Sequence, residues 1–420
     1  MKLSYFKHVL VKNFLALSTL QVINLVLPFI TLPYLTRVLG VSNYGVVVMV
    51  YSIMQFLSVI CDYGFNLSAT KDISLFRNNI SKVNTIFSSV LIIKSGLLTI
   101  SLLILVILTT YVPAIAANKM AYLTGFGIVI GQTLTPVWLF QGMENMKYIT
   151  LVNLVSKSLF TILIFVFIKS PENFIFIPLL YSVGFIIAGV LSLVFAYKEF
   201  GVSFYFPKSI NVIEQFKNST QYFYSRASVA IYTSSNNFVV GIILGEFYAG
   251  IFGVAEKLFT AMTVIYSPLS DAIYPYMVQK KDLKLFKKIF FTTITFNLLV
   301  SLITLFFATE IVCFVFGEGY EESALLLKYF CILALIIVPA TFIGYPLLGA
   351  FGFEKYANYS VVIASLVHLI ILICISSFLS IYSMVLLLIF TQIIVLSIRF
   401  IGVNKFLKQK EFINKKQLEV

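Results

Sequence analysis

The sequence predicts an all-α integral membrane protein with about twelve transmembrane helices, arranged as two six-helix bundles related by a parallel pseudo-two-fold repeat. Three observations predict this fold: the composition, a series of apolar runs of spanning length, and an internal repeat. Of the 420 residues, 60% are hydrophobic and 11% are charged, and the mean hydropathy is +0.99. Soluble domains carry roughly a quarter charged residues, so this composition suits a surface that faces lipid.

Apolar runs of about twenty residues, the length that crosses a bilayer, recur along the chain. The predicted spans are residues 14–36, 44–66, 83–110, 121–141, 148–168, 174–197, 219–243, 247–276, 288–309, 325–350, 357–376 and 381–402. The long spans 83–110 and 247–276 are expected to tilt, kink or extend into an interface. The basic start of the chain resembles a signal peptide, but its apolar run continues to about Tyr34 without a small-residue cleavage site, which favours an uncleaved first helix.

The distribution of positive charge predicts the orientation. With both termini cytoplasmic, 22 of the 30 Lys and Arg lie in cytoplasmic gaps or at the span ends beside them, four lie in outer gaps or at the span ends beside them, and four lie well inside spans. This asymmetry follows the positive-inside rule and supports an even number of helices. The net charge of +13 is therefore a feature of membrane topology, and no nucleic-acid partner is expected. The predicted domains are a bundle at 1–200, a cytoplasmic linker at 201–218, a bundle at 219–402 and a basic cytoplasmic tail at 403–420.

Two short patterns repeat at nearly the same offset. Residues 39–45 and 244–250 both contain Leu-Gly with a second glycine five residues after the first, 205 residues apart. Pro136, Gly142 and Glu144 correspond to Pro346, Gly352 and Glu354, 210 residues apart. Six predicted helices separate the copies, so both have the same membrane orientation. Parallel repeats of this kind occur in transporters, which place a substrate path between their halves.

Uncharged polar residues form stripes at helical spacing in several predicted spans. The residues of such a stripe either form hydrogen bonds between packed helices or line a water-filled cavity. For these residues both interpretations stay open. The stripes on spans one, two, five and seven contribute the candidate cavity residues Gln21, Asn24, Gln55, Asn153 and Asn236.

Charged residues within spans point more directly to a cavity, because a charge at the centre of a span costs roughly 2.5–3.5 kcal/mol. Arg226, Lys157 and Lys257 are candidate substrate-binding cations. Lys94 is expected to snorkel toward the cytoplasm. The excess of cations over acids predicts an anionic cargo, and arginine suits phosphate oxygens in a bidentate geometry.

Two acidic residues, Asp62 and Glu256, are candidates for ion coupling. Asp62 lies close to a predicted helix end, so an ordinary interfacial carboxylate is the alternative for it, and Lys257 has the alternative of pairing with a carboxylate.

The sequence contains no recognisable catalytic or metal site. The four cysteines lack paired spacing, and the two histidines are far apart. The gaps between spans hold neither a Gly-rich phosphate loop nor a nucleophile–base arrangement. We therefore expect no enzyme activity, no catalytic residue, no metal and no cofactor.

Residues 28–45, PFITLPYLTRVLGVSNYG, and residues 62–70, DYGFNLSAT, strongly resemble Wzx-type O-antigen flippases. These belong to the polysaccharide-transporter branch of the multidrug/oligosaccharidyl-lipid/polysaccharide exporter superfamily. Weaker echoes occur at 253–258, 268–275 and 344–355, so the similarity extends along nearly the whole chain and is densest at 20–77.

The resemblance implies a multi-pass protein of the bacterial inner membrane that moves an undecaprenyl-diphosphate-linked oligosaccharide repeat unit to the periplasmic leaflet. Its implied partners are this lipid-linked oligosaccharide, membrane lipids, a polysaccharide polymerase and a chain-length regulator. It also implies a cationic cavity, which Arg226, Lys157 and Lys257 match by type and depth only. A multidrug or cation exporter of the same superfamily is the alternative, and a membrane-embedded polymerase or glycosyltransferase is a distant one, because a shared fold does not decide the cargo.

Overall fold

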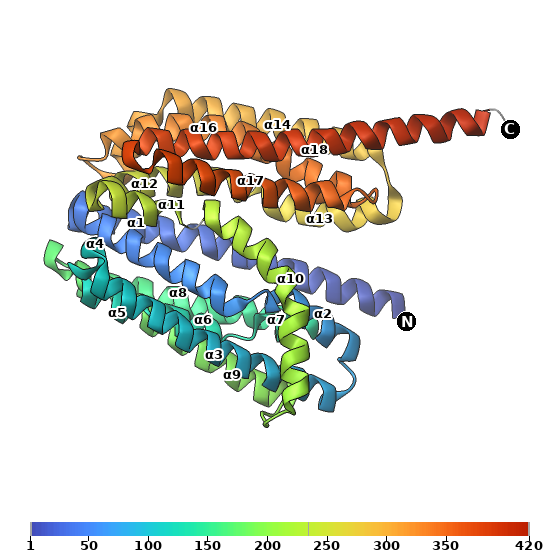
Figure 1. Cartoon of the computed structure of the whole chain (residues 1–420), viewed down its shortest axis with the longest axis horizontal. Helices are drawn as coiled ribbons and strands as arrows, with labels where there is room; N and C mark the ends of the chain where they lie inside the picture. Colours follow the sequence, from blue (N-terminus) through green and yellow to red (C-terminus); the bar gives the residue numbers. More distant parts are fainter. Residues whose placement is uncertain (1, 234, 419–420) are drawn as a thin grey trace. The chain divides into compact units, whose positions relative to one another are not determined.

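The structure is a computed structural model that describes the backbone of residues 2–233 and 235–418 and the side chains of residues 26–224, 226–233 and 235–409. The chain divides into two compact units, Met1–Gly250 and Ile251–Val420. Each unit is built from α-helices that are long and apolar enough to cross a membrane (Figure 1). The all-α membrane fold expected from the composition is confirmed.

Unit 1 contains the helices that form the candidate site. Its elements are α1 (Lys2–Asp62), α2 (Phe65–Phe76), α3 (Ile80–Tyr111), α4 (Pro113–Ala116), α5 (Lys119–Gly125), α6 (Gly127–Leu134), α7 (Val137–Gly142), α8 (Lys147–Phe167), η1 (Pro171–Phe176), α9 (Ile177–Phe200), α10 (Ser209–Thr233) and α11 (Asn236–Leu244). The next helix, α12 (Glu246–Thr263), begins in unit 1 and continues into unit 2.

Unit 2 contains the remaining helices. They are α13 (Tyr266–Lys280), α14 (Leu283–Phe306), α15 (Ala308–Phe316), α16 (Glu321–Phe342), the π-helical turn η2 (Ile343–Gly349), α17 (Glu354–Ile375), η3 (Ser376–Phe378) and α18 (Ile381–Leu418). Pro339 and Pro346 lie at the change from α16 to η2, where loss of amide donors explains why the regular helix ends. Arg399 donates a hydrogen bond of 2.6 Å to the carbonyl of Ala340, which lies where the regular helix is interrupted.

The number of spans agrees with the expected twelve. Among the described residues, ten helical stretches pass as single spans, and α10 with α11 forms an eleventh that is bent by 46°. One of the ten, Val26–Phe76, has 51 residues, which at 1.5 Å per residue is more than twice the thickness of the apolar core of a bilayer. It is broken at Gly40 and therefore supplies two spans.

The two copies of the Leu-Gly turn have the same backbone conformation. Gly40 has φ 72° and ψ 175°, and Gly245 has φ 97° and ψ 171°. This region of φ/ψ space is essentially restricted to glycine, which explains why both copies contain it. Each glycine marks the point where one spanning helix ends and the next begins.

The second glycine of each copy forms a reciprocal contact. A methyl group on Gly45 would lie 1.8 Å from the carbonyl oxygen of Glu246, and one on Gly250 would lie 2.4 Å from the carbonyl oxygen of Val41. Val41 and Glu246 are themselves equivalent at the repeat offset of 205. The start of α12 and the second half of α1 thus approach each other so closely that both helices need glycine at the contact.

The core of unit 1 has two main clusters. One forms around the second half of α1, with α3, α5 and α6, and includes Met49, Met54 and Tyr122. The other forms around α2, the start of α3 and α7, and is centred on the fully buried Trp138, whose ring lies 5.8 Å from that of Phe87.

Candidate functional site: a charged cavity in unit 1

A polar cavity of about 280 Å³ lies inside unit 1. Its walls come from α1, α2, α3, α6, α8 and α9 and from the break between α6 and α7. Its lining residues are Tyr51, Gln55, Ser58, Asp62, Asn66, Lys94, Gln132, Thr133, Thr135, Val137, Val152, Asn153, Ser156, Lys157, Phe185 and Ala188. Because lipid cannot satisfy polar groups, a concentration of amides, hydroxyls and charges at this depth indicates a hydrated path.

The walls follow from the helical spacing of polar residues. On α1, Tyr51, Gln55, Ser58 and Asp62 recur every three or four residues and therefore share one face. Tyr51 and Gln55 form a hydrogen bond along this face. The sequence prediction that residues 51–62 form a polar stripe is thus matched by one continuous wall of the cavity.

The wall from α8 presents Asn153, Ser156 and Lys157. Asn153 uses its amide nitrogen to bond the carbonyl of Ile149 at 2.9 Å, which fixes the side-chain orientation. Ser156 is 2% exposed, and its hydroxyl has no hydrogen-bond partner within the described part of the chain. A buried hydroxyl in a cavity wall is suited to a ligand or to water.

Lys94 is the most deeply buried charge in the cavity. It projects from α3 and is 3% exposed, so the expectation that it snorkels to the membrane surface is wrong. It interacts electrostatically with Asp62, which lines the same cavity. The sequence showed that Lys94 lies within a span but not the direction in which its side chain points.

Asp62 occupies the break between α1 and α2. Tyr63 and Gly64 both have positive φ, 45° and 79°, so the chain leaves α1 and starts α2 within two residues. The Asp62 carboxylate accepts hydrogen bonds from the backbone N–H groups of Gly64 and Asn66 at the start of α2. A helix N-terminus favours a negative charge, so this break holds the carboxylate in place.

Helix α10 packs on this break and carries Arg226. Tyr63 stacks between Phe216 and Phe223 at ring-centroid distances of 4.5 and 4.6 Å, and its hydroxyl lies 3.2 Å from that of Thr220. Arg226 is exposed and interacts electrostatically with Asp62. Arg226 is not a lining residue of the cavity, and its connection to the site passes through Asp62.

The other predicted site residues lie elsewhere. Lys257 and Glu256 are half-buried on α12 in unit 2, and both interact with other residues. Asn236 is buried at the start of α11 and donates to the carbonyl of Tyr232 in the last turn of α10 at 3.0 Å. The side chains of Gln21 and Asn24 lie outside the described residues. Of the predicted set, Gln55, Asp62, Asn153 and Lys157 are brought together in the cavity.

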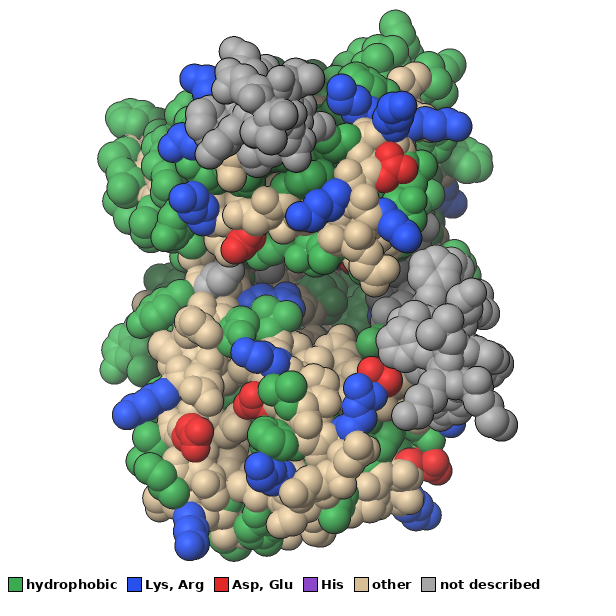
Figure 2. Space-filling view, turned by 90° about the vertical axis from the view of Figure 1, so that its right-hand side faces the viewer, with side chains coloured by type: hydrophobic (Ala, Val, Ile, Leu, Met, Phe, Trp, Pro, Cys, Tyr) green, Lys and Arg blue, Asp and Glu red, His purple; other side chains and the backbone are tan. Residues whose placement is uncertain are grey.

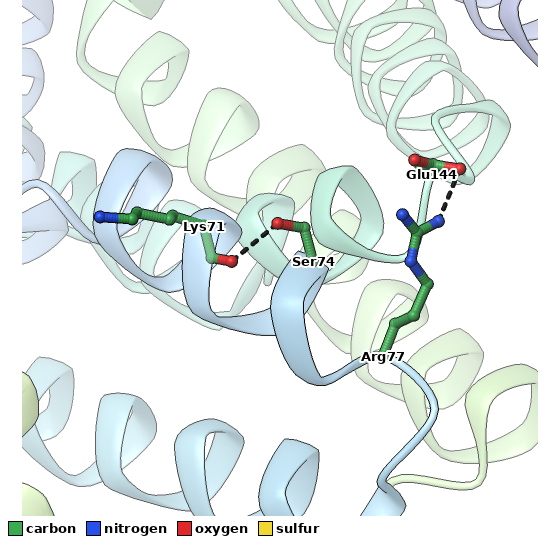
Figure 3. Close-up of polar contacts among 4 residues, drawn as sticks. All are labelled: Lys71, Ser74, Arg77 and Glu144. Atoms are coloured by element: carbon green, nitrogen blue, oxygen red, sulfur yellow. Dashed lines mark hydrogen bonds and ion pairs between the residues drawn. The ribbon is translucent and has the colours of Figure 1, made fainter.

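An ion pair connects the end of α2 to the turn after α7, beside the cavity. Arg77, directly after α2, bonds Glu144 in the turn after α7 at 2.7 Å (Figure 3). Arg77 donates this bond to the Glu144 carboxylate, which raises the pKa of Arg77. Glu144 has φ 55°, and its equivalent turn in unit 2 contains Gly352 with φ 83°.

Comparison with known proteins places the chain in a family. The sequence model described as polysaccharide biosynthesis protein matches residues 10–281, which is more than half of the chain. The chain belongs to the polysaccharide biosynthesis protein family.

Two relatives are similar to the chain over most of their length. A protein of Escherichia coli named "Putative O-antigen transporter" is 26% identical over 367 residues, covering 86% of this chain and 88% of that protein. The protein of the same name from Shigella dysenteriae is 26% identical over 387 residues, covering 91% and 97%. The resemblance found in residues 28–45 and 62–70 is therefore confirmed at the level of the whole chain.

Solved structures show that this polysaccharide biosynthesis family member has a transporter fold. The lipid II flippase MurJ in an inward closed conformation matches with a TM-score of 0.73 and 15% identity, covering 94% of this chain and 87% of that chain. The MATE transporter VcmN of Vibrio cholerae matches with a TM-score of 0.63 and 14% identity, covering 97% and 98%. These identities establish the shared fold and not the cargo.

Proposed function

We propose that the protein is a flippase that moves an undecaprenyl-diphosphate-linked oligosaccharide repeat unit from the cytoplasmic to the periplasmic leaflet of the bacterial inner membrane, for O-antigen or other surface polysaccharide. The observation that carries the proposal is the charge of the cavity. Lys94 and Lys157 line it against the single carboxylate of Asp62, so its wall has a net positive charge. An anionic group entering from water is stabilised by this excess.

The chemistry of a diphosphate suits these groups. Lysine ammonium groups bind phosphate oxygens as point charges, and the amides and hydroxyls of the walls can hydrogen-bond to sugar hydroxyls. Gln55, Gln132 and Asn153 provide three such amides. The prenyl chain, which has no polar group to satisfy, remains in lipid. The protein acts as a carrier in alternating access, and no bond of the cargo is made or broken.

Charge also distinguishes this cargo from that of a multidrug or cation exporter. A cationic drug entering the cavity would meet Lys94 and Lys157 with only Asp62 to attract it. The names of the relatives from Escherichia coli and Shigella dysenteriae support the same choice.

The membrane potential can supply the driving force. A cargo with two negative charges gains about 4–5 kcal/mol per 100 mV when it moves outward, since each charge contributes about 2.3 kcal/mol. Asp62 or Glu256 is the candidate for any additional counter-ion. The proposed setting includes both termini in the cytoplasm and a polysaccharide polymerase with its chain-length regulator as downstream partners.

The test is to delete the gene and measure which lipid-linked repeat unit accumulates in the cell. We expect an undecaprenyl-diphosphate-linked oligosaccharide to accumulate and surface polysaccharide to be lost. Lys157→Arg should restore most export and Lys157→Ala should not, because loss of one charged hydrogen bond costs about 1.5–3 kcal/mol, or roughly tenfold to a hundredfold in cargo affinity. Arg226→Ala and Arg226→Lys form a second pair, in which we expect Ala to lower export and Lys to retain part of it, because Arg226 interacts electrostatically with Asp62 of the cavity.

All variants are compared at matched protein levels in the membrane. Full export by Lys157→Ala and Arg226→Ala together would contradict charge recognition of the cargo. A deletion strain that accumulates no lipid-linked sugar would contradict the flippase function itself.

A further inference from the structure

The segment between α9 and α10 carries an exposed apolar surface that the proposed transport path does not use. Its members, which we call the aromatic ridge, are Phe204, Phe206, Ile210 and Ile213, with exposed fractions of 41%, 85%, 64% and 48%. The rings of Phe204 and Phe206 lie 5.4 Å apart in an edge-to-face arrangement. Such a concentration of apolar side chains on one short segment indicates an interaction surface.

The ridge is held in place by hydrogen bonds on its opposite side. Ser203 and Asn84 exchange two hydrogen bonds of 2.9 Å, and the backbone N–H of Tyr205 donates to the hydroxyl of Ser88 at 3.1 Å. Alternate residues of an extended chain point in opposite directions. Because Ser203 and Tyr205 bond to α3, Phe204 and Phe206 point away from the helix bundle.

The ridge continues the lipid-facing surface of α9. Exposed apolar residues recur every three or four positions along that helix, in the order Leu179, Val183, Ile187, Val190, Val194 and Tyr197. This stripe ends at Tyr197, in the last turn of α9, and the ridge begins seven residues later at Phe204. The first half of α10 then runs across the ends of α3 and α9 instead of along them (Figure 1). A helix in this position lies parallel to the membrane plane when α3 and α9 cross it.

Positive charges flank the ridge. Lys198, Lys208 and Lys217 are all exposed on the segment and the adjoining helix ends, and with the exposed Glu199 and Glu214 they give residues 198–217 a net charge of +1. Seen from this end, unit 1 has lysine and arginine side chains distributed over its surface, with aspartate and glutamate side chains among them (Figure 2). Aromatic and aliphatic groups beside exposed lysines are the composition that binds an anionic lipid surface.

We propose that the aromatic ridge inserts into the membrane–water interface, where Phe206 and Ile210 enter the acyl boundary and Lys208 and Lys217 bind anionic phospholipid headgroups. The occupant of this surface is the bilayer itself. The other face of α10 contacts the Asp62 break through Ser219, which bonds Ser68 at 2.6 Å, and through Gln215, which bonds Asp72 at 3.1 Å. Because one face of α10 would contact lipid and the other contacts unit 1, the lipid contact would help to hold in position the helix that carries Arg226.

Fluorescence depth measurements in nanodiscs test this proposal. The protein has one tryptophan, Trp138, so Phe206→Trp is placed in a Trp138→Phe background. The purified full-length protein is reconstituted with lipids brominated just below the headgroup, and acrylamide serves as the aqueous quencher. Asn78→Trp, in the exposed turn between α2 and α3 at the same end of unit 1, is the matched water-facing control.

We expect the brominated lipids to remove most of the emission of Phe206→Trp, while acrylamide removes most of that of Asn78→Trp. Quenching of Phe206→Trp by acrylamide alone would overturn the proposal, because the ridge would then face water. Protection from both quenchers would also overturn it, because the ridge would then be covered by protein, such as a second copy of the chain.

A second pair of variants tests the choice of lipid. In mixed nanodiscs, brominated phosphatidylglycerol should quench Phe206→Trp more strongly than brominated phosphatidylcholine at equal mole fraction. The double variant Lys208→Gln with Lys217→Gln should remove this preference. We expect the loss of each lysine to lower the affinity for the anionic lipid about fivefold. An equal response to both lipids in the unmodified ridge would contradict the role of the lysines.

Discussion

Lys94 illustrates the energetic problem that a charged cavity poses at the level of single residues. Burying an ammonium group costs several kcal/mol unless nearby groups compensate for the lost water. The carboxylate of Asp62, held by the N-terminus of α2, is the compensating charge. When cargo is absent, Asp62 partly neutralises Lys94 and Arg226. An anionic cargo would take over that role.

This balance makes Asp62 and Lys94 energetically coupled. We expect Asp62→Asn and Lys94→Met each to lower the stability of the protein, and the double variant to be more stable than the sum of the two effects. The coupling should be about 1–3 kcal/mol, in the range found for residues of one charge network. Thermal unfolding of the four proteins in detergent measures it. Strictly additive effects would show that the two charges do not compensate each other.

A cavity residue could be predicted from the sequence where a regular polar stripe on one helical face fixed the direction of its side chain. Gln55 and Asp62 share a stripe with Tyr51, so periodicity placed them on one wall. Lys94 has no such stripe on α3, and only packing against neighbouring helices decides its direction. Lys257 was selected for its depth in a span, but depth does not determine which surface a residue faces.

At the level of elements, the helix breaks determine the shape of unit 1. The break at Asp62–Gly64 positions the carboxylate, and the break at Thr135–Pro136 opens the wall beside Val137. The sequence analysis predicted neither break, because the predicted spans 44–66 and 121–141 run through them. It could not show that α10 packs on the first break, because that contact joins segments more than 150 residues apart.

The contact between the second half of α1 and the start of α12 provides a test of how tightly these elements pack. Gly45→Ala would place a methyl group 1.8 Å from the carbonyl oxygen of Glu246, so the helices must separate. We expect a loss of about 1–3 kcal/mol of stability, as for other overpacked sites. Thermal unfolding in detergent measures this loss.

Gly96→Ala on α3 is the matched control. A methyl group there has no atom within 4 Å, so the change should be neutral or stabilise the helix by up to about 1 kcal/mol. Equal melting temperatures for the two variants would show that the approach at Gly45 is not tight.

At the level of the whole molecule, the fold was largely predictable because the bilayer restricts the choices. The length of each apolar run predicts a span, and the asymmetry of positive charge predicts which loops are cytoplasmic. The first two spans, predicted at 14–36 and 44–66, lie in one helical stretch that is interrupted at Gly40, and the second prediction runs past the end of α1 at Asp62 into the break at Tyr63 and Gly64. The division into bundles at 1–200 and 219–402 and the parallel symmetry axis stay predictions.

The orientation in the membrane can be tested by labelling single cysteines. The four native cysteines are first replaced, since Cys374 is exposed and would react. We expect Glu321→Cys to be labelled by an impermeant reagent in intact cells and Lys284→Cys to be labelled only after the cells are permeabilised. Labelling at position 284 from outside would reverse the predicted topology.

The reciprocal glycine contact explains why the second glycine is present in both copies of the internal repeat. If the two halves arose by duplication, most positions of the turn have been free to drift, and Val41, Ser42 and Tyr44 now correspond to Glu246, Phe247 and Ala249. Gly45 and Gly250 could not drift, because each leaves no room for a side chain against the other copy. A side chain at either position would force the second half of α1 and the start of α12 apart, so each copy of the turn restricts which residues the other can carry.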